Sequence, residues 1–360
     1  MKANEFLRIA ERLMRHPAAP YYEAALRAEA EMICREHRLR WRRDEFGNLI
    51  VRLQTRPGLR PLVLSAHLDH PGFEIIAAID ERRLRARFLG GVPDSYFRRK
   101  VPVRLLPGMV PARLGRELPG KKKFELIAQG PFEAMPEFAV WELGDFVVRH
   151  GEIHGRACDD LVGVACILAT LIDLKRAHAR VNVLGVLSRA EEIGFQGALV
   201  LASSKLLSKR TLVISLETSS ELPPVKMGQG VILRVGDKAS IFDPTASRFL
   251  AEVAGALQRR DKSFQYQRAL MSGGTCEGTA YQEFGFQTAA VCVALGNYHN
   301  CGPARRIAEE FVNVGDGLSM VRLLAAAARE MARFDAHTGK LRKGLGVLLR
   351  EAKARLPKNA

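Results

Sequence analysis

Four short runs that are apolar at almost every position constrain the fold of this chain more than any other feature. They lie at residues 61–66 (PLVLSA), 181–188 (VNVLGVLS), 211–216 (TLVISL) and 288–295 (TAAVCVAL). Strands buried on both faces have this character, as in parallel sheets covered by helices. Helical patterns such as VGVACILATLIDL alternate with these runs, and a long apolar-striped helix is predicted from Ile307. We therefore predict an α/β fold with a mostly parallel, mixed sheet flanked by helices.

A segment of different character separates the first apolar run from the later ones. From Phe73 to Ile153 the sequence breaks into short alternating stretches punctuated by glycine and proline, which is typical of a small β domain. Two amphipathic helices are predicted before the first run. We predict a catalytic domain formed by residues 1–73 and 154–336, an inserted β domain at 74–153, and a basic C-terminal helix or tail at 337–360.

The composition is that of an ordinary globular protein with 47% hydrophobic residues, and its strongest bias is a formal net charge of +16. This charge favours anionic partners, but no nucleic-acid recognition motif accompanies it. We interpret the positive charge as solvated surface, and we expect neither a nucleic acid nor a membrane as partner.

The location of the protein is predicted from two other features. No stretch resembles a membrane span or a signal peptide, and the six cysteines are scattered along the chain. We therefore expect a cytoplasmic protein with reduced thiols.

Ionisable residues follow each of the four apolar runs. In chain order they are His67 and Asp69, Glu191 and Glu192, Glu217, and His299. Ligands of parallel α/β sheets bind outside the carboxyl ends of the strands, so these side chains are expected to share one crevice. Histidine and carboxylate groups are ligands for Zn²⁺ and similar divalent ions. The sequence therefore predicts a metal site.

The spacing of these residues suggests how such a site would work. His67 and Asp69 are two positions apart and share a strand face, so Asp69 could orient the imidazole. Adjacent Glu191 and Glu192 must point differently, so that one can bind metal while the other takes a proton from metal-bound water. Asp159 stands where a helix cap is favoured, but a bridging carboxylate there would complete two metal sites.

The motifs around these residues resemble one known family. AHLDHPGF, ACDDLVG, EEIGFQGA, SLETS, SGGTCEG and NYHN follow the order and spacing of the glutamyl-aminopeptidase and cellulase-M-like metallopeptidases, the TET-type aminopeptidases. The likeness covers most of the chain except the tail. It implies a zinc-exopeptidase-like catalytic domain with two divalent ions per subunit, zinc or alternatively cobalt or manganese. It also implies an inserted β-barrel-like domain and a homo-oligomer, either a dimer or a larger particle.

The same resemblance implies a role for each candidate residue. Asp159 bridges the two metals, His67 and Glu217 complete one site, Glu192 and His299 complete the other, Glu191 is the general base, and Asp69 orients its neighbours. The implied reaction is attack by metal-held water on the first peptide carbonyl of a short peptide with a free N-terminus.

Three positions depart from the family pattern. Glu217 stands where aspartate is usual, Cys276 replaces the aspartate of GGTD, and NYHNCGP replaces RYIHS. We interpret Cys276 as a pocket-lining thiol rather than a nucleophile, because no base is evident beside it, and we expect His70 to touch substrate. Two alternatives stay open: a related co-catalytic zinc carboxypeptidase or amide deacylase, and an inactive peptidase fold that binds anionic partners.

Overall fold

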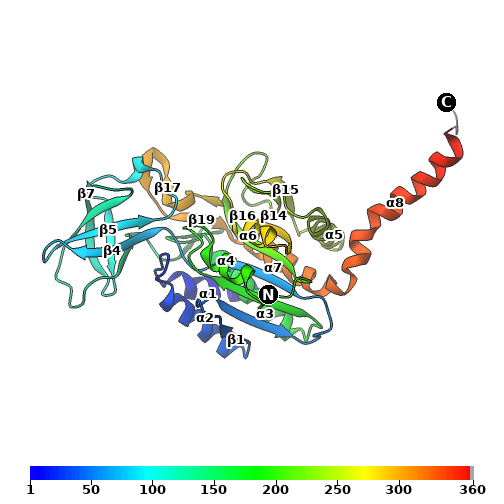
Figure 1. The fold of residues 1–360 in the computed structure, drawn as a ribbon, viewed down its shortest axis with the longest axis horizontal. Helices are drawn as coiled ribbons and strands as arrows, with labels where there is room; N and C mark the ends of the chain where they lie inside the picture. Colours follow the sequence, from blue (N-terminus) through cyan, green and yellow to red (C-terminus); the bar gives the residue numbers. More distant parts are fainter. Residues whose placement is uncertain (357–360) are drawn as a thin grey trace.

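The structure is a computed structural model that describes residues 1–356. Its large sheet has eleven strands, of which four run parallel at the centre. In spatial order these are β12 (Asn182–Ser188), β3 (Leu62–His67), β13 (Leu212–Ser220) and β16 (Gln287–Gly296). They coincide with the four apolar runs. The predicted α/β fold is confirmed, and the earliest of the four strands lies in the middle of the sheet (Figure 1).

Antiparallel strands flank this parallel centre. On one side β2 (Leu49–Gln54) pairs with β12, and β1 (Arg40–Arg43) pairs with β2. On the other side β16 pairs with β14 (Val231–Gly236), which carries β15 (Tyr266–Leu270), and with β19 (Glu310–Asn313). The hairpin of β10 (Val147–Arg149) and β11 (Glu152–Gly155) extends the sheet beyond β19.

Two sequence-based boundaries differ from the structure in this region. Residues 147–153 were expected to belong to the inserted β domain, but Ile153 pairs with Val312 in the large sheet. The helix expected from Ile307 begins only at Val314, because residues 310–313 form β19. The two differences have separate causes. Residues 147–153 were predicted to be β structure, but an alternating pattern does not show which sheet a strand joins. The strand β19 has only four residues, too few to show a recognisable period before a long helix.

Helices cover both faces of the large sheet. On one face α1 (Ala3–Met14), α3 (Leu161–Arg176) and α7 (Val314–Glu330) pack together, with α2 (Ala24–Glu36) and α5 (Pro244–Arg260) beside them. On the other face α4 (Gln196–Ser203) packs against α6 (Glu277–Glu283). Leu62 and Leu64 of β3 join the first core and Val63 joins the second, which explains why this strand is apolar throughout.

A closed barrel of six strands projects from the large sheet (Figure 1). Its strands are β4 (Gly72–Ala78), β5 (Arg83–Leu89), β6 (Pro102–Leu106), β7 (Val110–Leu118), β8 (Lys123–Ala128) and β9 (Phe138–Trp141). The ring of Phe73 fills the interior, with its centroid 4.9 Å from that of Phe88 and 5.0 Å from that of Trp141. Because β4 begins soon after β3 ends at His67, the barrel stands beside the carboxyl ends of the central strands.

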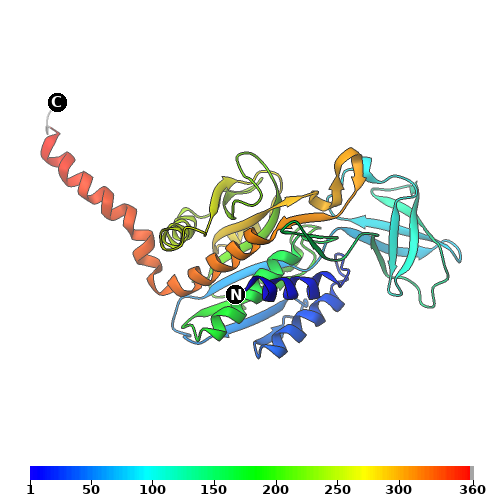
Figure 2. The same ribbon diagram turned by 180° about the vertical axis from the view of Figure 1, so that it is seen from behind.

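Short elements complete the chain. They are the 3-10 turns η1 (Asp94–Tyr96), η2 (Tyr298–Asn300), η3 (Pro303–Arg305) and η4 (Met331–Arg333), and the small hairpin of β17 (Cys301–Gly302) and β18 (Arg306–Ile307). The last helix, α8 (Phe334–Arg355), leaves the body at the end opposite the barrel, as both views show (Figures 1 and 2). The predicted basic tail is thus helical through Arg355, and residues 357–360 lie outside the described residues. Within residues 1–356, no helix combines the length and apolarity that crossing a bilayer requires.

Candidate metal centre

Five predicted ligands come together at the carboxyl ends of the central strands. His67 is the last residue of β3, Asp159 precedes α3, Glu192 follows β12, Glu217 lies within β13, and His299 follows β16. The parallel register pairs Ser188 with His67, so β12 and β3 end side by side. Glu217 is the one ligand that lies inside a strand rather than at its end or in a loop, because β13 continues to Ser220.

The five side chains form two overlapping groups. The ligand atoms of His67, Asp159 and Glu217 lie within 4.8 Å of one another, and so do those of Asp159, Glu192 and His299. Asp159 belongs to both groups. One of its carboxylate oxygens is 3.5 Å from Nε2 of His67, and the other is 3.6 Å from Nε2 of His299. A carboxylate that faces two imidazoles in this way is suited to bridge two cations.

Several oxygens of this cluster lack the partners that buried polar atoms require. One carboxylate oxygen each of Asp159, Glu192 and Glu217 is buried without a hydrogen bond. Leaving such an atom unpaired is costly, because it has lost its hydration and gained nothing in return. Imidazole nitrogens and carboxylate oxygens are the donors that Zn²⁺ and related divalent ions accept. The residues therefore fit divalent cations, which would satisfy the orphaned oxygens.

The electrostatics of the cluster agree with this fit. Burial on its own lowers the pKa of His67 and His299, but Glu191 near the first, Glu192 near the second and Asp159 near both raise their pKa values well above the ordinary range. Burial also raises the pKa of Glu217 to about 8. Both shifts reflect a surplus of negative charge in a site with little water. Bound cations would neutralise that surplus.

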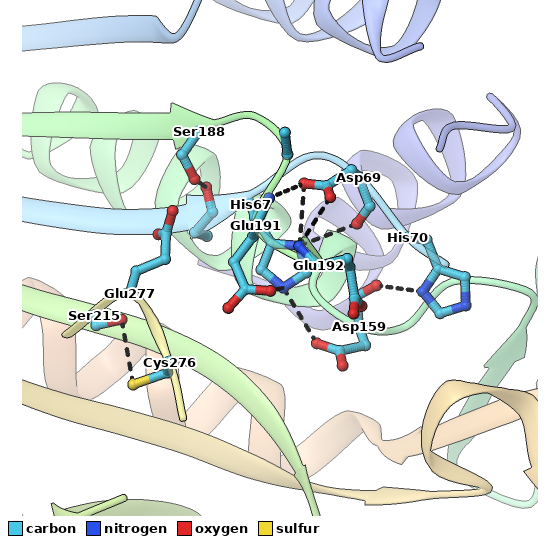
Figure 3. A network of polar contacts seen from close by, with 12 residues as sticks. His67, Asp69, His70, Asp159, Ser188, Glu191, Glu192, Ser215, Cys276 and Glu277 are labelled. Atoms are coloured by element: carbon cyan, nitrogen blue, oxygen red, sulfur yellow. Dashed lines mark hydrogen bonds and ion pairs between the residues drawn. The ribbon is translucent and has the colours of Figure 1, made fainter. Parts of the chain in front are cut away.

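Asp69 organises the loop that carries the two adjacent glutamates (Figure 3). Its carboxylate oxygens accept the backbone amides of Glu191 at 2.9 Å and Glu192 at 3.1 Å. Nδ1 of His67 donates to the main-chain oxygen of Asp69 at 3.0 Å, whereas the nearest carboxylate oxygen is 3.7 Å away. Asp69 therefore orients the imidazole through its backbone and the glutamate loop through its side chain.

Glu191 and Glu192 point to different histidines, as their adjacency predicted. A carboxylate oxygen of Glu192 lies 3.2 Å from Nε2 of His299, while one of Glu191 lies 4.0 Å from Nε2 of His67. Burial raises the pKa of Glu191 well above its ordinary value, so its carboxylate binds a proton more readily than an exposed glutamate does. This is the property that a general base near neutral pH requires.

The loop that carries His299 has an uncommon backbone conformation. Asn297, His299 and Asn300 have φ angles of 55°, 53° and 60°, in the left-handed region that asparagine tolerates better than most residues. Nδ1 of His299 donates to the carbonyl oxygen of Gly91, in the barrel segment after β5, at 2.8 Å. A Cβ atom on Gly91 would meet the imidazole at 3.3 Å. The barrel thus contributes directly to the orientation of a candidate ligand.

His70 and Glu310 hold the backbone of Asp159 through hydrogen bonds. The prediction that His70 touches substrate is wrong, because both its ring nitrogens have protein partners: the backbone oxygen of Asp159 at 2.8 Å and the side-chain oxygen of Asn300 at 3.0 Å. Glu310 is fully buried and accepts the backbone amide of Asp159 at 3.0 Å. Sequence reasoning missed Glu310, since nothing in AEEFVN separates it from an exposed glutamate.

A second buried carboxyl group, that of Glu277, lies to one side of Glu191 (Figure 3). Glu277 is inaccessible to solvent and accepts a hydrogen bond from Ser65, two residues before His67, at 2.8 Å. Sequence reasoning passed over it and assigned a role to its neighbour Cys276 instead. That thiol is buried in the core 4.0 Å from the hydroxyl of Ser215, and burial raises its pKa far above the ordinary value. The predicted pocket-lining role is therefore wrong, and such a thiol is also unsuited to act as a nucleophile.

A narrow pocket adjoins Glu217. It has a volume of about 30 Å³, and its walls include Arg234 of β14, Ser219 of β13 and Tyr298. Arg234 is only 4% exposed, donates to the hydroxyl of Ser219 at 3.3 Å, and leaves its Nε without a partner. A water molecule needs roughly 10–15 Å³ on this scale, so the space suits a group as small as a carboxylate. A buried guanidinium with a free donor would bind such a group strongly.

Comparison with known proteins gives one family match. Residues 136–309 match the family model described as M42 glutamyl aminopeptidase. This range contains four of the five candidate ligands and Glu191, and it leaves out His67 and most of the barrel.

Solved structures share the fold over nearly the whole chain. The TET1 peptidase of Pyrococcus horikoshii is 24% identical, with a TM-score of 0.73 over 91% of this chain and 100% of its own. An aminopeptidase from the archaeon Desulfurococcus kamchatkensis is 20% identical, with a TM-score of 0.74 over 91% of this chain and 95% of its own. A TET aminopeptidase from a marine sediment archaeon of the Thaumarchaeota is 17% identical, with a TM-score of 0.77 over 92% of this chain and 99% of its own.

Proposed function

Given that the chain belongs to the M42 glutamyl aminopeptidase family of metal-dependent peptidases, we propose that it removes the N-terminal residue of short peptides with two divalent metal ions. The observation that carries this proposal is the pair of ligand groups that share Asp159. Two-metal aminopeptidases hold their ions about 3.5–4 Å apart, which a shared carboxylate makes possible. The orphaned oxygens of Glu192 and Glu217 support the same assignment.

Each side chain has a definite task in this proposal. His67, Asp159 and Glu217 would hold one ion, and Asp159, Glu192 and His299 would hold the other, with zinc as the first candidate and cobalt or manganese as alternatives. When bound, the ions would supply a Lewis acid for the peptide carbonyl and lower the pKa of water.

In this proposal Glu191 carries out the proton transfer. Its buried carboxylate takes a proton from the attacking water and passes it to the leaving amine. Asp69 fixes the position of Glu191 by accepting its backbone amide at 2.9 Å. Holding base, water and carbonyl in one geometry removes much of the entropic cost of the reaction.

The direct test measures release of N-terminal residues from a panel of aminoacyl substrates and short peptides. Protein stripped with a chelator would be assayed before and after reloading with Zn²⁺, Co²⁺ or Mn²⁺. We expect release only from reloaded protein and only from peptides with a free amine, with N-acetylated peptides as matched controls. No release with any metal, in protein shown to hold two ions, would contradict the proposal.

We also propose that the preferred N-terminal residue is acidic. The pocket beside Glu217 contains the partly unpaired guanidinium of Arg234 and has room for a small anionic group. The first side chain of a peptide bound at the metals would lie next to this pocket, because Glu217 belongs to both. The glutamyl specificity in the name of the matched family agrees with this chemistry.

Arg234→Gln tests the acidic preference. We expect kcat/KM for glutamyl and aspartyl substrates to fall about 10- to 100-fold relative to that for alanyl substrates, since a hydrogen bond to a charged group contributes roughly 1.5–3 kcal/mol. The ratio between substrates is the measurement, so a general loss of activity cancels. Arg268→Gln, at an exposed arginine on neighbouring β15, is the control and should leave the ratio unchanged. An unchanged ratio in Arg234→Gln would exclude this role.

The same pocket gives a specific reason to keep a second candidate function. A carboxypeptidase also needs a cation for the carboxylate of its substrate, and Arg234 could bind the C-terminus of a peptide instead of an acidic side chain. Peptides blocked at the N-terminus with a free C-terminus separate the two functions. Their cleavage, with loss of activity on C-terminal amides, would favour the carboxypeptidase.

Self-association is the last part of the proposal. The TET1 peptidase of Pyrococcus horikoshii is described as assembling into a tetrahedron or a large octahedral shell. We infer that this chain also forms a homo-oligomer, because it has the same fold over 91% of its length. Light scattering would give the number of subunits.

A further inference from the structure

The C-terminal helix α8 has an apolar stripe that nothing in the described structure covers. Its contacts with the body involve its first two turns: Phe334 and His337 are buried, and Lys340 forms an ion pair with Glu252 of α5. From Leu341 to Leu356 no residue is buried. The helix extends from the body into solvent, which both views show (Figures 1 and 2).

Large apolar side chains gather on one face of this exposed part. Leu341, Leu345 and Leu348 follow the i, i+4, i+7 spacing of a helical stripe, and Leu349 lies beside them. They are 52%, 55%, 58% and 55% exposed, respectively. Scattered exposed leucines are ordinary, but a continuous stripe on an isolated helix marks a surface that binds something.

Basic residues are the most frequent charged residues on the remainder of the helix surface, which also carries the exposed Val347 on the face opposite the stripe. Between Leu341 and Leu356 there are five cations and one carboxylate; the cations are Arg342, Lys343, Arg350, Lys353 and Arg355, and the carboxylate is Glu351. At 100° per residue, Arg342 and Lys353 border one edge of the stripe and Arg355 borders the other. Lys343 and Arg350 lie on the opposite face.

This arrangement argues against a second copy of α8 as the partner. Pairing two copies through their leucines would bring the bordering cations of one helix against those of the other, and like charges at such positions repel. The glycines at 344 and 346 also weaken the helix in isolation, so it gains order from whatever covers its stripe. Charge complementarity calls for an anionic surface.

We propose that α8 is an interfacial helix that docks the protein on a membrane surface containing anionic lipid. A basic amphipathic helix lies in the plane of such a surface, with its apolar stripe among the acyl chains and its cations at the headgroups. A bilayer suits this helix better than a protein groove, because cations on the back of the helix also gain from an extended negative surface. The expectation of no membrane partner treated the positive charge as solvated surface, whereas α8 places part of that charge beside an exposed apolar stripe.

The test is flotation of the full chain with vesicles of neutral lipid alone or with added anionic lipid. Binding to anionic vesicles should exceed binding to neutral vesicles about tenfold or more and should weaken as salt is added. Leu345→Gln with Leu348→Gln should reduce binding about tenfold or more, because glutamine keeps the helix but replaces the two central leucines of the stripe. Leu345→Met with Leu348→Met, at the same positions, should bind as the unaltered protein does.

Three outcomes would overturn the proposal. Equal binding to neutral and anionic vesicles would remove the role of charge. Wild-type binding by the glutamine variant would show that surface charge alone suffices and that the stripe is not used. Absence of vesicle binding, together with a smaller assembly of the glutamine variant in solution, would assign the stripe to contacts between copies of this chain.

Discussion

Glu191→Gln is expected to reduce kcat about 10²- to 10⁴-fold while leaving the metal content unchanged. Glutamine keeps the size of the side chain and its place on the loop held by Asp69, but it cannot accept a proton from the attacking water. The measurement pairs peptide hydrolysis with metal analysis of the same protein. If Glu191 is a base and not a metal ligand, hydrolysis falls while the metal content stays the same.

Glu192→Gln is the matched control for that experiment, since it makes the same change one residue further along. Glu192 lies 3.2 Å from Nε2 of His299 and belongs to a ligand group that includes Asp159, so its loss should weaken metal binding as well as activity. If Glu191→Gln lost metal and Glu192→Gln kept it, the two roles would have to be exchanged. His67, Glu191 and Glu192 also form a close group, which makes this comparison necessary.

The parts of the fold that were predictable from sequence are those with a strong periodic signal. The strands β3, β12, β13 and β16 are apolar on both faces because helices cover both sides of the sheet, with α3, α5 and α7 on one side and α4 and α6 on the other. This burial requires apolar residues at almost every position, which the sequence shows. A ligand at the end of each such strand follows from topology alone, since parallel strands end at a common edge.

Elements and residues without such a signal were missed. The strand β19 has four residues, too few to distinguish it from the start of the helix that follows. Glu310 and Glu277 acquire their positions only in three dimensions, where one supports the backbone of Asp159 and the other receives Ser65. His70 was assigned to substrate because it lies near His67 in sequence, whereas the fold turns its ring toward the protein.

Asp159→Asn is expected to have the largest effect of any single substitution at the site. Asp159 is the one residue shared by both ligand groups, with its two oxygens 3.5 Å and 3.6 Å from the two imidazoles. Loss of a residue that only supports a metal ligand costs about 10- to 100-fold in affinity, and loss of a bridging ligand should cost more. We expect at most one bound ion and no measurable peptide hydrolysis.

The unfolding temperature gives an independent test of metal binding by Asp159→Asn. Ions that bind only the folded protein stabilise it, and a 100-fold loss of affinity removes up to about 2.7 kcal/mol of that effect. Added Zn²⁺ should therefore raise the unfolding temperature of the unaltered protein much more than that of Asp159→Asn. Asp94→Asn, which makes the same substitution at an exposed carboxylate of the barrel, should respond to Zn²⁺ as the unaltered protein does. Two ions bound to Asp159→Asn at unaltered affinity would mean that the carboxylate does not bridge them, and each ion would then be held by its remaining side chains alone.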